Sequence, residues 1–354
     1  MSFLSKSKSI VGVDIGSSSV KMVELVHKPK GIELLHAGIA PLPPEAIVQG
    51  AFLNSSAIVE AIAEATANAG IKTKQVAAAV SGHSVIVKKI SLPSMTRDEL
   101  EESIRWEAEQ YIPFDINEVN LDFQILESEE GDGQMDVLLV AAKKDLIDDY
   151  VAVLSEAGLV PRVVDVAAFA VANAFTTNHD PEPGEVAALV NIGAQTVNIN
   201  ILAGGIPAFT RDISAGGNQY TEEIQKTLSV AFDEAERIKL GGRSQSDEQE
   251  VVPQEVEDSI QSVTETLISE ITRSLDFFQA TSAESRIARV VLSGGGAKVS
   301  GLEKAFYERT QLKIERLDPL ARMLPSNRFE PGFLEELAPS LAVCIGLALR
   351  SAEA

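Results

Sequence analysis

Apolar runs separated by glycine and proline dominate the start of the chain. Such runs predict strands over residues 10–16, 20–25, 32–40 and 75–80. Between them, apolar side chains at three- and four-residue spacing predict a helix over residues 56–69 that ends at Gly70. Strands and a helix within one stretch of chain indicate an α/β domain.

The pattern changes over residues 84–161, which we interpret as a small α/β insertion within the first lobe. Thr96 and Glu99 have the spacing of a capping box and predict the start of a helix that continues to Tyr111. The remaining predicted elements are strands over residues 119–126 and 135–142 and a helix over residues 145–157.

The second half of the chain returns to the strand-rich pattern of the first. An alanine-rich helix is predicted over residues 163–175, and a polar linker over residues 176–184 follows it. The apolar positions of residues 256–280 recur at a spacing of three or four and predict a long amphipathic helix. The other predicted elements are a hairpin over residues 186–202, a strand over 206–213 and helices over 219–240 and 339–349.

Composition excludes several classes of function. With 354 residues the chain can form two to three lobes, and 45% apolar residues are typical of a folded globular protein. The formal charge of −22 argues against nucleic-acid binding, which depends on cationic side chains. The single cysteine, Cys344, excludes an internal disulfide, and the four histidines show no metal-ligand spacing. Since no run approaches the about 20 apolar residues of a membrane-spanning helix, we expect a cytoplasmic protein.

Three glycine-rich turns carry the candidate chemistry, and each follows an apolar strand. In the first turn, Gly16 lets the backbone approach a phosphate, and Lys21 can reach a phosphate oxygen. Asp14 can hold Mg²⁺ through water. Further hydroxyl and N–H donors are Ser17, Ser18 and Ser19. One such turn alone is also consistent with a plain hairpin, so the combination of turns carries the prediction.

The second and third turns lie in the other half of the chain. The second has Asn191 where the first has Asp14, and its candidate phosphate ligands are Asn191, Gly193, Ala194 and Gln195. The third lets an adenosine lie flat against backbone and consists of Gly294, Gly295 and Gly296 with Lys298. Gly216 and Gly217 open a helix and predict an anion site. Glu236 and Lys239 are candidates to hold ribose and base, with a solvated helix pair as the alternative.

The order of these segments resembles the superfamily of actin, heat-shock chaperone and sugar-kinase ATPases. Proteins of that superfamily have five sequence motifs in a fixed order, called phosphate 1, connect 1, phosphate 2, adenosine and connect 2. Within it the chain is similar to the PilM family of type IV pilus assembly proteins over nearly its whole length, with the cell-division protein FtsA as a further relative. The most family-specific match is residues 104–114, and the others are Gly216-Gly217 with residues 221–224 and residues 162–170, 274–278 and 346–350.

The resemblance implies an α/β, actin-like (ribonuclease H-like) ATPase fold of two duplicated lobes, with an FtsA-type inserted subdomain and with ATP and Mg²⁺ between the lobes. The implied division is the first lobe over 1–83, the inserted subdomain over 84–161, a first-lobe connection over 162–184, the second lobe over 185–215 and 281–337, its subdomain over 216–280, and a helix over 338–354 that returns to the first lobe.

The resemblance also implies a protein partner. PilM relatives bind the N-terminal cytoplasmic peptide of the inner-membrane protein PilN, so this protein would sit at the inner membrane through PilN and link it to the cytoplasmic motor. An extended apolar peptide needs a hydrophobic groove, although each candidate lining residue can instead pack in a core. The candidates are Ile112, Pro113, Phe114, Val119, Leu121 and Phe123.

Two neutral residues depart from the pattern of ATP-hydrolysing relatives. Asn191 and Asn218 stand where those relatives often carry an acidic residue that helps to place Mg²⁺ and the attacking water. Asp165 is the carboxylate near the connect 1 position that orients water. We therefore predict ATP binding with slow or negligible hydrolysis. An FtsA-like filament-forming ATPase and a small-molecule kinase are the alternatives, and a homo-oligomer remains open.

Overall fold

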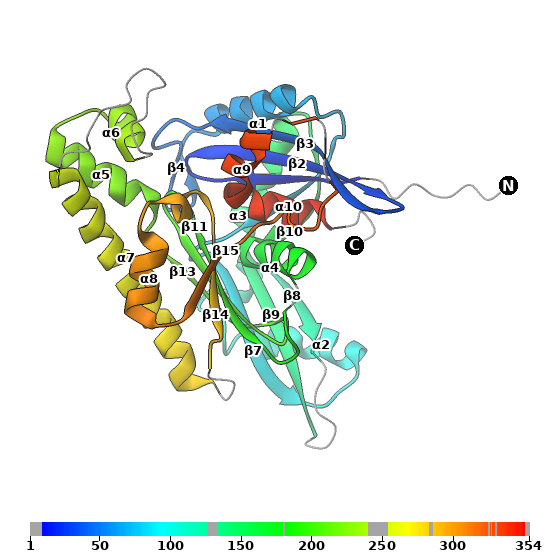
Figure 1. Ribbon diagram of the computed structural model, residues 1–354. Helices are drawn as coiled ribbons and strands as arrows, with labels where there is room; N and C mark the ends of the chain where they lie inside the picture. The colour runs from blue at the N-terminus through cyan, green and yellow to red at the C-terminus, as the bar shows by residue number, and fades with distance from the viewer. Residues whose placement is uncertain are drawn as a thin grey trace.

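Two five-stranded sheets, each with helices on both faces, form the body of the protein (Figure 1). The computed structural model describes residues 9–126, 133–179, 181–239, 254–282, 286–324, 326, 328–329 and 331–350. Residues 1–8 and 351–354, at the outer limits of the predicted first lobe and C-terminal helix, lie outside the described residues.

The first sheet has the strand order β10-β6-β1-β2-β3, in which β1, β2 and β3 are antiparallel while β6 and β10 run parallel to β1. On one face α1 and α3 close an apolar core, and on the other face α4 and α10 close a second. The bounds are β1 Val11–Ile15, β2 Ser19–Lys28, β3 Gly31–Pro41, β6 Gln75–Val80, β10 Val160–Val166, α1 Ser55–Ala69, α3 Lys144–Glu156, α4 Ala167–Asn178 and α10 Ala342–Ala348.

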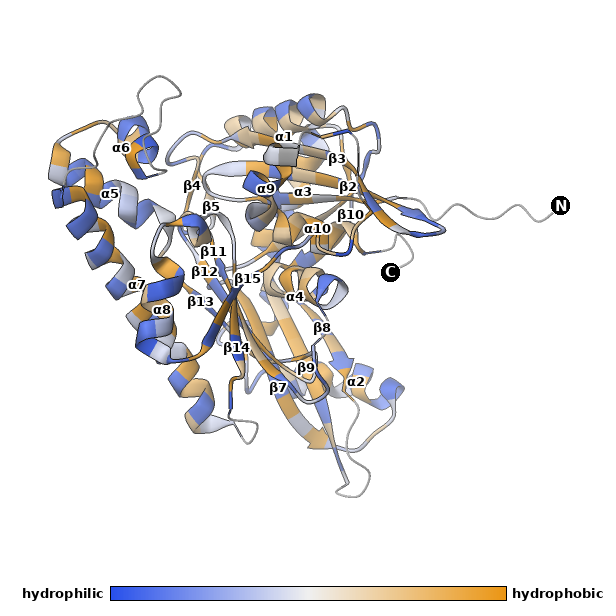
Figure 2. Ribbon diagram, in the orientation of Figure 1, coloured by the Kyte–Doolittle hydropathy of each residue, from blue (hydrophilic) through white to orange (hydrophobic). Residues whose placement is uncertain are grey.

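The second sheet has the same connectivity, with the order β13-β12-β11-β14-β15. Again an antiparallel three-strand meander is followed by two strands parallel to its first strand. The apolar stripe of α7 packs on this sheet, as its three-four periodicity predicts, and the helix shows both hydrophobic and hydrophilic colours along its length (Figure 2). The bounds are β11 Val186–Ile192, β12 Val197–Ala203, β13 Ile206–Ile213, β14 Arg289–Ser293, β15 Lys313–Arg316, α7 Gln254–Thr281 and α8 Leu302–Thr310.

The inserted segment forms a separate three-stranded sheet of order β7-β9-β8, with α2 packed on it. In Figure 1 this layer lies at the lower end, away from α1. The predicted capping box is confirmed, because Thr96 and Glu99 each bond the other's backbone N–H at the start of α2. The bounds are β7 Val85–Pro93, α2 Arg97–Ala108, η1 Ile116–Glu118, β8 Val119–Ile125 and β9 Gln134–Lys143.

Two elements around the insertion differ from the sequence prediction. Tyr150, Val153 and Leu154 of α3 are buried in the first-lobe core beside α1, although we predicted this helix within the inserted subdomain. Residues 163–166 form the end of strand β10 and not the start of a helix, because this valine-rich run pairs with β6. Local alanine content predicted the helix, and the partner strand decided the outcome.

The helical segments of the second half also divide differently. The helix predicted over residues 219–240 is two helices, separated where Ser229 adopts a left-handed backbone with φ 54°. Through α4 the two lobes touch, since Asn200 of β12 donates a hydrogen bond to the Ala168 carbonyl at 2.9 Å. Among the described helices, none is long and apolar enough to cross a bilayer. The remaining bounds are β4 Ile47–Val48, β5 Ala51–Phe52, α5 Gly217–Leu228, α6 Phe232–Lys239, η2 Gly295–Lys298, α9 Pro331–Leu337 and η3 Ala338–Leu341.

Candidate functional site

The first glycine turn joins β1 to β2 and places an acid beside a base. Strand register pairs Asp14 with Lys21, whose Nζ lies 3.2 Å from the Asp14 Oδ2. The turn closes when the Gly16 N–H donates to the Ser19 carbonyl at 3.1 Å. A Cβ at Gly16 would lie 3.3 Å from the Ser19 carbonyl oxygen and 3.4 Å from the Lys21 Nζ, so the turn would accept a small side chain with little adjustment.

Burial and charge set the protonation state of this turn. Burial by itself would lower the pKa of Lys21, but the Asp14 carboxylate outweighs it and the net pKa is raised, so the lysine is a cation at neutral pH. Burial also raises the pKa of the Cys344 thiol well above its ordinary value. Cys344 is therefore a neutral buried group whose Sγ–H donates to the Lys21 carbonyl at 3.2 Å.

The second turn has the same backbone geometry and different side chains. The Gly193 N–H donates to the Thr196 carbonyl at 2.9 Å, as Gly16 does to Ser19. Register pairs Asn191 with Asn198, the positions that correspond to Asp14 and Lys21. The Asn191 Nδ2 donates to the Asn198 Oδ1 at 3.0 Å, so an amide pair replaces the ion pair.

The third turn packs directly on the second. Gly294 has φ +86°, and a Cβ there would lie 2.8 Å from the Asn191 Oδ1 and would also collide with the Ile192 carbonyl. At Gly296 a Cβ would collide with the Ile192 side chain. The Gly295 position is open to ordinary contact with Ser340. The structure therefore brings the predicted phosphate 2 and adenosine turns together.

Each lobe has a lysine close to a glycine turn, with Lys21 at the first turn and Lys298 in η2 after the third. Burial is the main cause that lowers the pKa of Lys298; the Glu336 carboxylate opposes this shift and the charge of Lys21 adds to it. Two cations near three glycine turns suit a polyphosphate.

The backbone N–H groups at the start of α5 make hydrogen bonds that the sequence did not predict. The Gly217 N–H donates to the Gly193 carbonyl at 2.9 Å, and the Asn218 N–H donates to the Ala194 carbonyl at 2.8 Å. The anion site predicted at Gly216 and Gly217 therefore lacks these two donors in this conformation. Instead they tie α5 to the second turn.

Glu236 and Lys239 point to the start of α5. The Lys239 Nζ donates to the Gly217 carbonyl at 3.3 Å and to the Thr221 Oγ1 at 3.0 Å. The Glu236 carboxylate accepts from both Lys239 and Thr221. Since the Lys239 side chain is only 11% exposed, this pair is not the solvated helix pair that we considered as the alternative.

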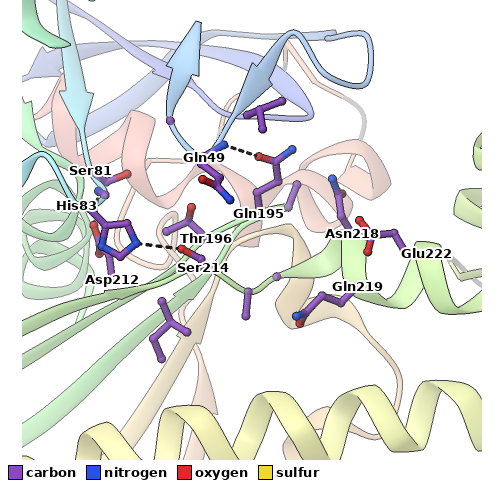
Figure 3. A pocket seen from close by; sticks show the side chains of 17 residues that line it. Gln49, Ser81, His83, Gln195, Thr196, Asp212, Ser214, Asn218, Gln219 and Glu222 are labelled. Atoms are coloured by element: carbon purple, nitrogen blue, oxygen red, sulfur yellow. Dashed lines mark hydrogen bonds between the residues drawn. The ribbon is translucent and has the colours of Figure 1, made fainter. Parts of the chain in front are cut away.

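A cavity of ≈330 Å³ opens between the lobes beside the second turn (Figure 3). Its first-lobe wall includes Gln49, whose N–H donates to the Gln195 Oε1 at 3.3 Å. The His83 ring contacts the Ser214 Oγ at 3.1 Å across the same gap. Sequence reasoning missed these wall residues because no motif marks them and only the fold assembles them: Gln49, Ser81, His83, Asp212, Ser214, Gln219 and Glu222.

Asp165, the predicted water-orienting carboxylate, is buried at the end of β10. Its Oδ2 lies 3.4 Å from the Arg350 Nε, and its Oδ1 accepts the Val166 N–H at 2.8 Å. Burial raises the pKa of Asp165, although Arg350 and the Val166 N–H oppose the shift. The structure gives this carboxylate an ion-pair partner.

The predicted groove residues divide into two groups. Ile112 and Val119 are buried in the core of the insertion. Phe114 and Phe123 are partly buried, and a cationic side chain lies over each ring. The Lys143 Nζ is 4.6 Å from the centre of the Phe114 ring, and the Arg97 guanidinium is 5.6 Å from the centre of the Phe123 ring. Leu121 is partly buried and Pro113 is exposed.

Comparison with known proteins agrees with this geometry. Residues 12–352 match the family described as type IV pilus assembly protein PilM. A solved PilM-PilN type IV pilus biogenesis complex contains a chain with 32% identity and a TM-score of 0.86, covering 98% of this chain and 100% of that chain. The ethanolamine utilization protein EutJ from Carboxydothermus hydrogenoformans has 15% identity, a TM-score of 0.59 and coverages of 96% and 89%.

The protein MreB 5 of Spiroplasma citri, solved with AMPPNP, has 12% identity, a TM-score of 0.53 and coverages of 96% and 95%. At these identities EutJ and MreB 5 inform on the fold alone. Together the matches confirm the predicted α/β, actin-like fold of two duplicated lobes.

Proposed function

Because this chain belongs to the PilM family of type IV pilus assembly proteins, we propose that it is a nucleotide-binding adaptor of the pilus assembly machinery. The observation that carries this proposal is the pair of equivalent glycine turns, one in each lobe, with Lys21 at the first turn and Lys298 in η2 after the third. Backbone amides at such turns and two ammonium groups provide the donors and the charge that a triphosphate requires.

In this proposal each turn has a distinct role. Ser17, Ser18 and Ser19 donate to phosphate oxygens, while the Gly294–Gly296 backbone lies against the adenosine. Glu236 and Lys239, next to the start of α5, hold the ribose and base. Asp14 is 21% exposed beside Lys21 and would hold Mg²⁺ through water, which would neutralise phosphate charge.

We also propose that the protein holds ATP and hydrolyses it slowly. Asn191 is neutral, its amide nitrogen bonds Asn198, and its oxygen accepts the Ser293 hydroxyl at 3.2 Å. Asp165 is paired with Arg350. Neither side chain resembles a free carboxylate that activates water, which also disfavours the kinase alternative.

The proposed partner is the N-terminal cytoplasmic peptide of a PilN-type inner-membrane protein, through which the adaptor would attach to the membrane and connect it to the motor. A solved relative at 32% identity is a PilM-PilN complex. Phe114, Leu121 and Phe123 are the candidate contacts, since they retain exposed apolar surface beside the insertion core, where an extended peptide can pack.

Titration of the protein with a fluorescent ATP analogue tests the proposed nucleotide site. Lys21→Met and Lys298→Met should each weaken binding between about 10-fold and about 100-fold, because each removes a charged hydrogen bond. Lys304→Met is the matched control, since that side chain is 81% exposed on α8. Unchanged affinity in both site variants would remove the proposed site.

Fluorescence anisotropy with a labelled PilN-type peptide tests the proposed partner binding. Phe114→Ala and Phe123→Ala should each weaken binding about 10-fold or more, as expected for aromatic anchors. Tyr307→Ala is the control, an aromatic residue that is 51% exposed on α8. If the wild-type protein binds no peptide with or without ATP, the adaptor role is wrong.

A further inference from the structure

A continuous chain of polar contacts runs from the adenosine turn to the segment that leads into the insertion. The Ser293 hydroxyl donates to the Asn191 Oδ1 at 3.2 Å, and the Asn191 Nδ2 donates to the Asn198 Oδ1 at 3.0 Å. The Asn198 Nδ2 donates to the Asp212 Oδ1 at 2.8 Å. Finally, the Gly82 N–H donates to the Asp212 Oδ2.

Sheet register creates this chain. Ser293 of β14 is opposite Asn191 of β11, which is opposite Asn198 of β12, which is opposite Asp212 of β13. Residues directly opposite one another project from the same face of a sheet, so the four side chains form one row across its end. Asn191 and Ser293 belong to the second and third turns, whereas Asn198 and Asp212 belong to no local motif.

The last contact of the row crosses from the second lobe to the first. Gly82 lies between β6 of the first-lobe sheet and β7 of the insertion, with φ +92°. The next residue, His83, contacts the Ser214 hydroxyl, as the dashed line in Figure 3 shows. Since β13 also packs on β7, the end of the second-lobe sheet lies against the start of the inserted segment.

Asp212 has a special place in the row because it only accepts hydrogen bonds. Each asparagine amide carries a donor end and an acceptor end, whereas an ionised carboxylate has acceptors alone. Asp212 therefore directs the NH₂ group of Asn198 toward itself, which turns the Asn198 oxygen to Asn191 and the Asn191 oxygen to Ser293. Burial raises the pKa of Asp212, while hydrogen bonds from Asn198 and Gly82 oppose that shift.

We propose that Asp212 is a positioning residue that couples the nucleotide turns of the second lobe to the inserted subdomain through Gly82. The proposal rests on the proposed function for its ligands, ATP and the PilN-type peptide. Movement of the second lobe relative to the first makes or breaks the contact between Asp212 and Gly82. Loss of this contact frees the segment from which β7 begins, so the nucleotide state of the cleft reaches the partner surface without any direct contact between the two ligands.

Hydrogen exchange of the full-length protein, followed by mass spectrometry, tests the contact directly and without nucleotide. Asp212→Ala should raise the exchange rate of a peptide containing Gly82 about 10-fold or more, because its amide loses its acceptor. Exchange in β11 and β14 should stay near wild type. Arg211→Ala is the matched control, since Arg211 is the exposed neighbour on the same strand.

Asp212→Asn provides the conservative comparison. If Asn191 and Asn198 both reverse their amides, the amide oxygen introduced in this variant can still accept from Gly82, and the Ser293 hydroxyl can accept from Asn191. The variant should therefore keep most of the Gly82 protection. Unchanged exchange in Asp212→Ala, or an increase spread over the whole second lobe, would overturn the role of Asp212.

Peptide affinity with and without ATP tests the coupling. In the wild type the two affinities should differ, and in Asp212→Ala the difference should fall about fivefold or more while peptide binding itself persists. Equal nucleotide dependence in both proteins would overturn the proposal. If the wild type binds no ATP, the proposed function fails, while the nucleotide-free exchange experiment still decides whether Asp212 holds Gly82.

Discussion

The two phosphate turns share a backbone and differ in chemistry. Gly16 and Gly193 close their turns through the same hydrogen bond, and both turns follow a strand that pairs antiparallel with the next. At the corresponding paired positions one turn has Asp14 with Lys21 and the other has Asn191 with Asn198. Strand pairing and glycine therefore determine the backbone of the turn, while the residues at one pair of positions determine whether the turn carries charge.

The largest effect is expected when the second turn is made to resemble the first. Asn191→Asp gives the second turn the carboxylate that the first turn has in Asp14, so under the proposed function ATP hydrolysis should rise about 10-fold or more. Asn191→Ala, which adds no charge, should not increase it. Measurement of phosphate release under saturating ATP checks this, and equal rates in both variants would show that the amide does not limit hydrolysis.

A smaller effect is expected on stability, where alanine substitution of Gly193 and of Gly16 should lower the free energy of unfolding by different amounts. A Cβ at Gly193 would lie 2.9 Å from the Thr196 carbonyl oxygen, whereas one at Gly16 would lie 3.3 Å from that of Ser19. Gly193→Ala should therefore lower the free energy of unfolding by about 2 kcal/mol, and Gly16→Ala by less than about 1 kcal/mol. Denaturant unfolding of both variants measures the difference, and the reverse order would contradict the geometry.

The acetylation rate of Lys298 tests whether the Lys21 ammonium group lies close to it. Because burial, with a smaller contribution from Lys21, lowers the pKa of Lys298 against the opposing Glu336, more of its amine is neutral at about pH 8–9. Its acetylation rate at that pH, relative to its own rate at about pH 11, should therefore exceed the corresponding ratio for Lys304 several-fold. Lys21→Met should slow this reaction, since loss of the neighbouring charge raises the Lys298 pKa. Mass spectrometry of partly acetylated protein reports both rates, and a faster reaction in Lys21→Met would contradict the arrangement.

The smallest effect is a difference in alkaline stability between the turns. The folded-state pKa of Lys21 is raised, so its contribution to folding is fully present below its ordinary value of 10.5 and is lost as pH rises through the folded pKa. Asp14→Asn should remove this contribution, about 1 kcal/mol or less, and flatten the pH dependence above about pH 10. Asn191→Ala should leave that slope unchanged, because the second turn has no titrating pair.

Much of the fold was predictable because its signals are local. The capping box at Thr96 and Glu99 and the apolar stripe of α7 lie within a few residues of chain, and both are confirmed. Two predicted helices were wrong in their bounds, the start of the alanine-rich helix and the single helix over residues 219–240, and helix α3 packs in the first-lobe core and not in the inserted subdomain. Pairing with β6 places residues 163–166 in a strand, and the left-handed Ser229 ends the first of the two helices within 219–240.

The candidate site was predictable only in part. The sequence marked the three glycine turns, but it did not show that the Gly217 and Asn218 amides bond the second turn, nor that Asp165 pairs with Arg350. Those contacts depend on sheet register and on how α5 and α10 pack, which no short stretch of sequence encodes.

Short runs of residues were enough to predict the duplicated strand-turn-strand units and the exchange of Asp14 for Asn191, and several such runs spread along the chain indicated the family. The contacts across the lobes, such as that between Asp212 and Gly82, which are 130 positions apart, could be identified only in the folded structure. This difference arises from the distance along the chain over which each interaction acts. Periodicity and turn chemistry act over a few residues, whereas a hydrogen bond between lobes exists only after two sheets have formed and packed together.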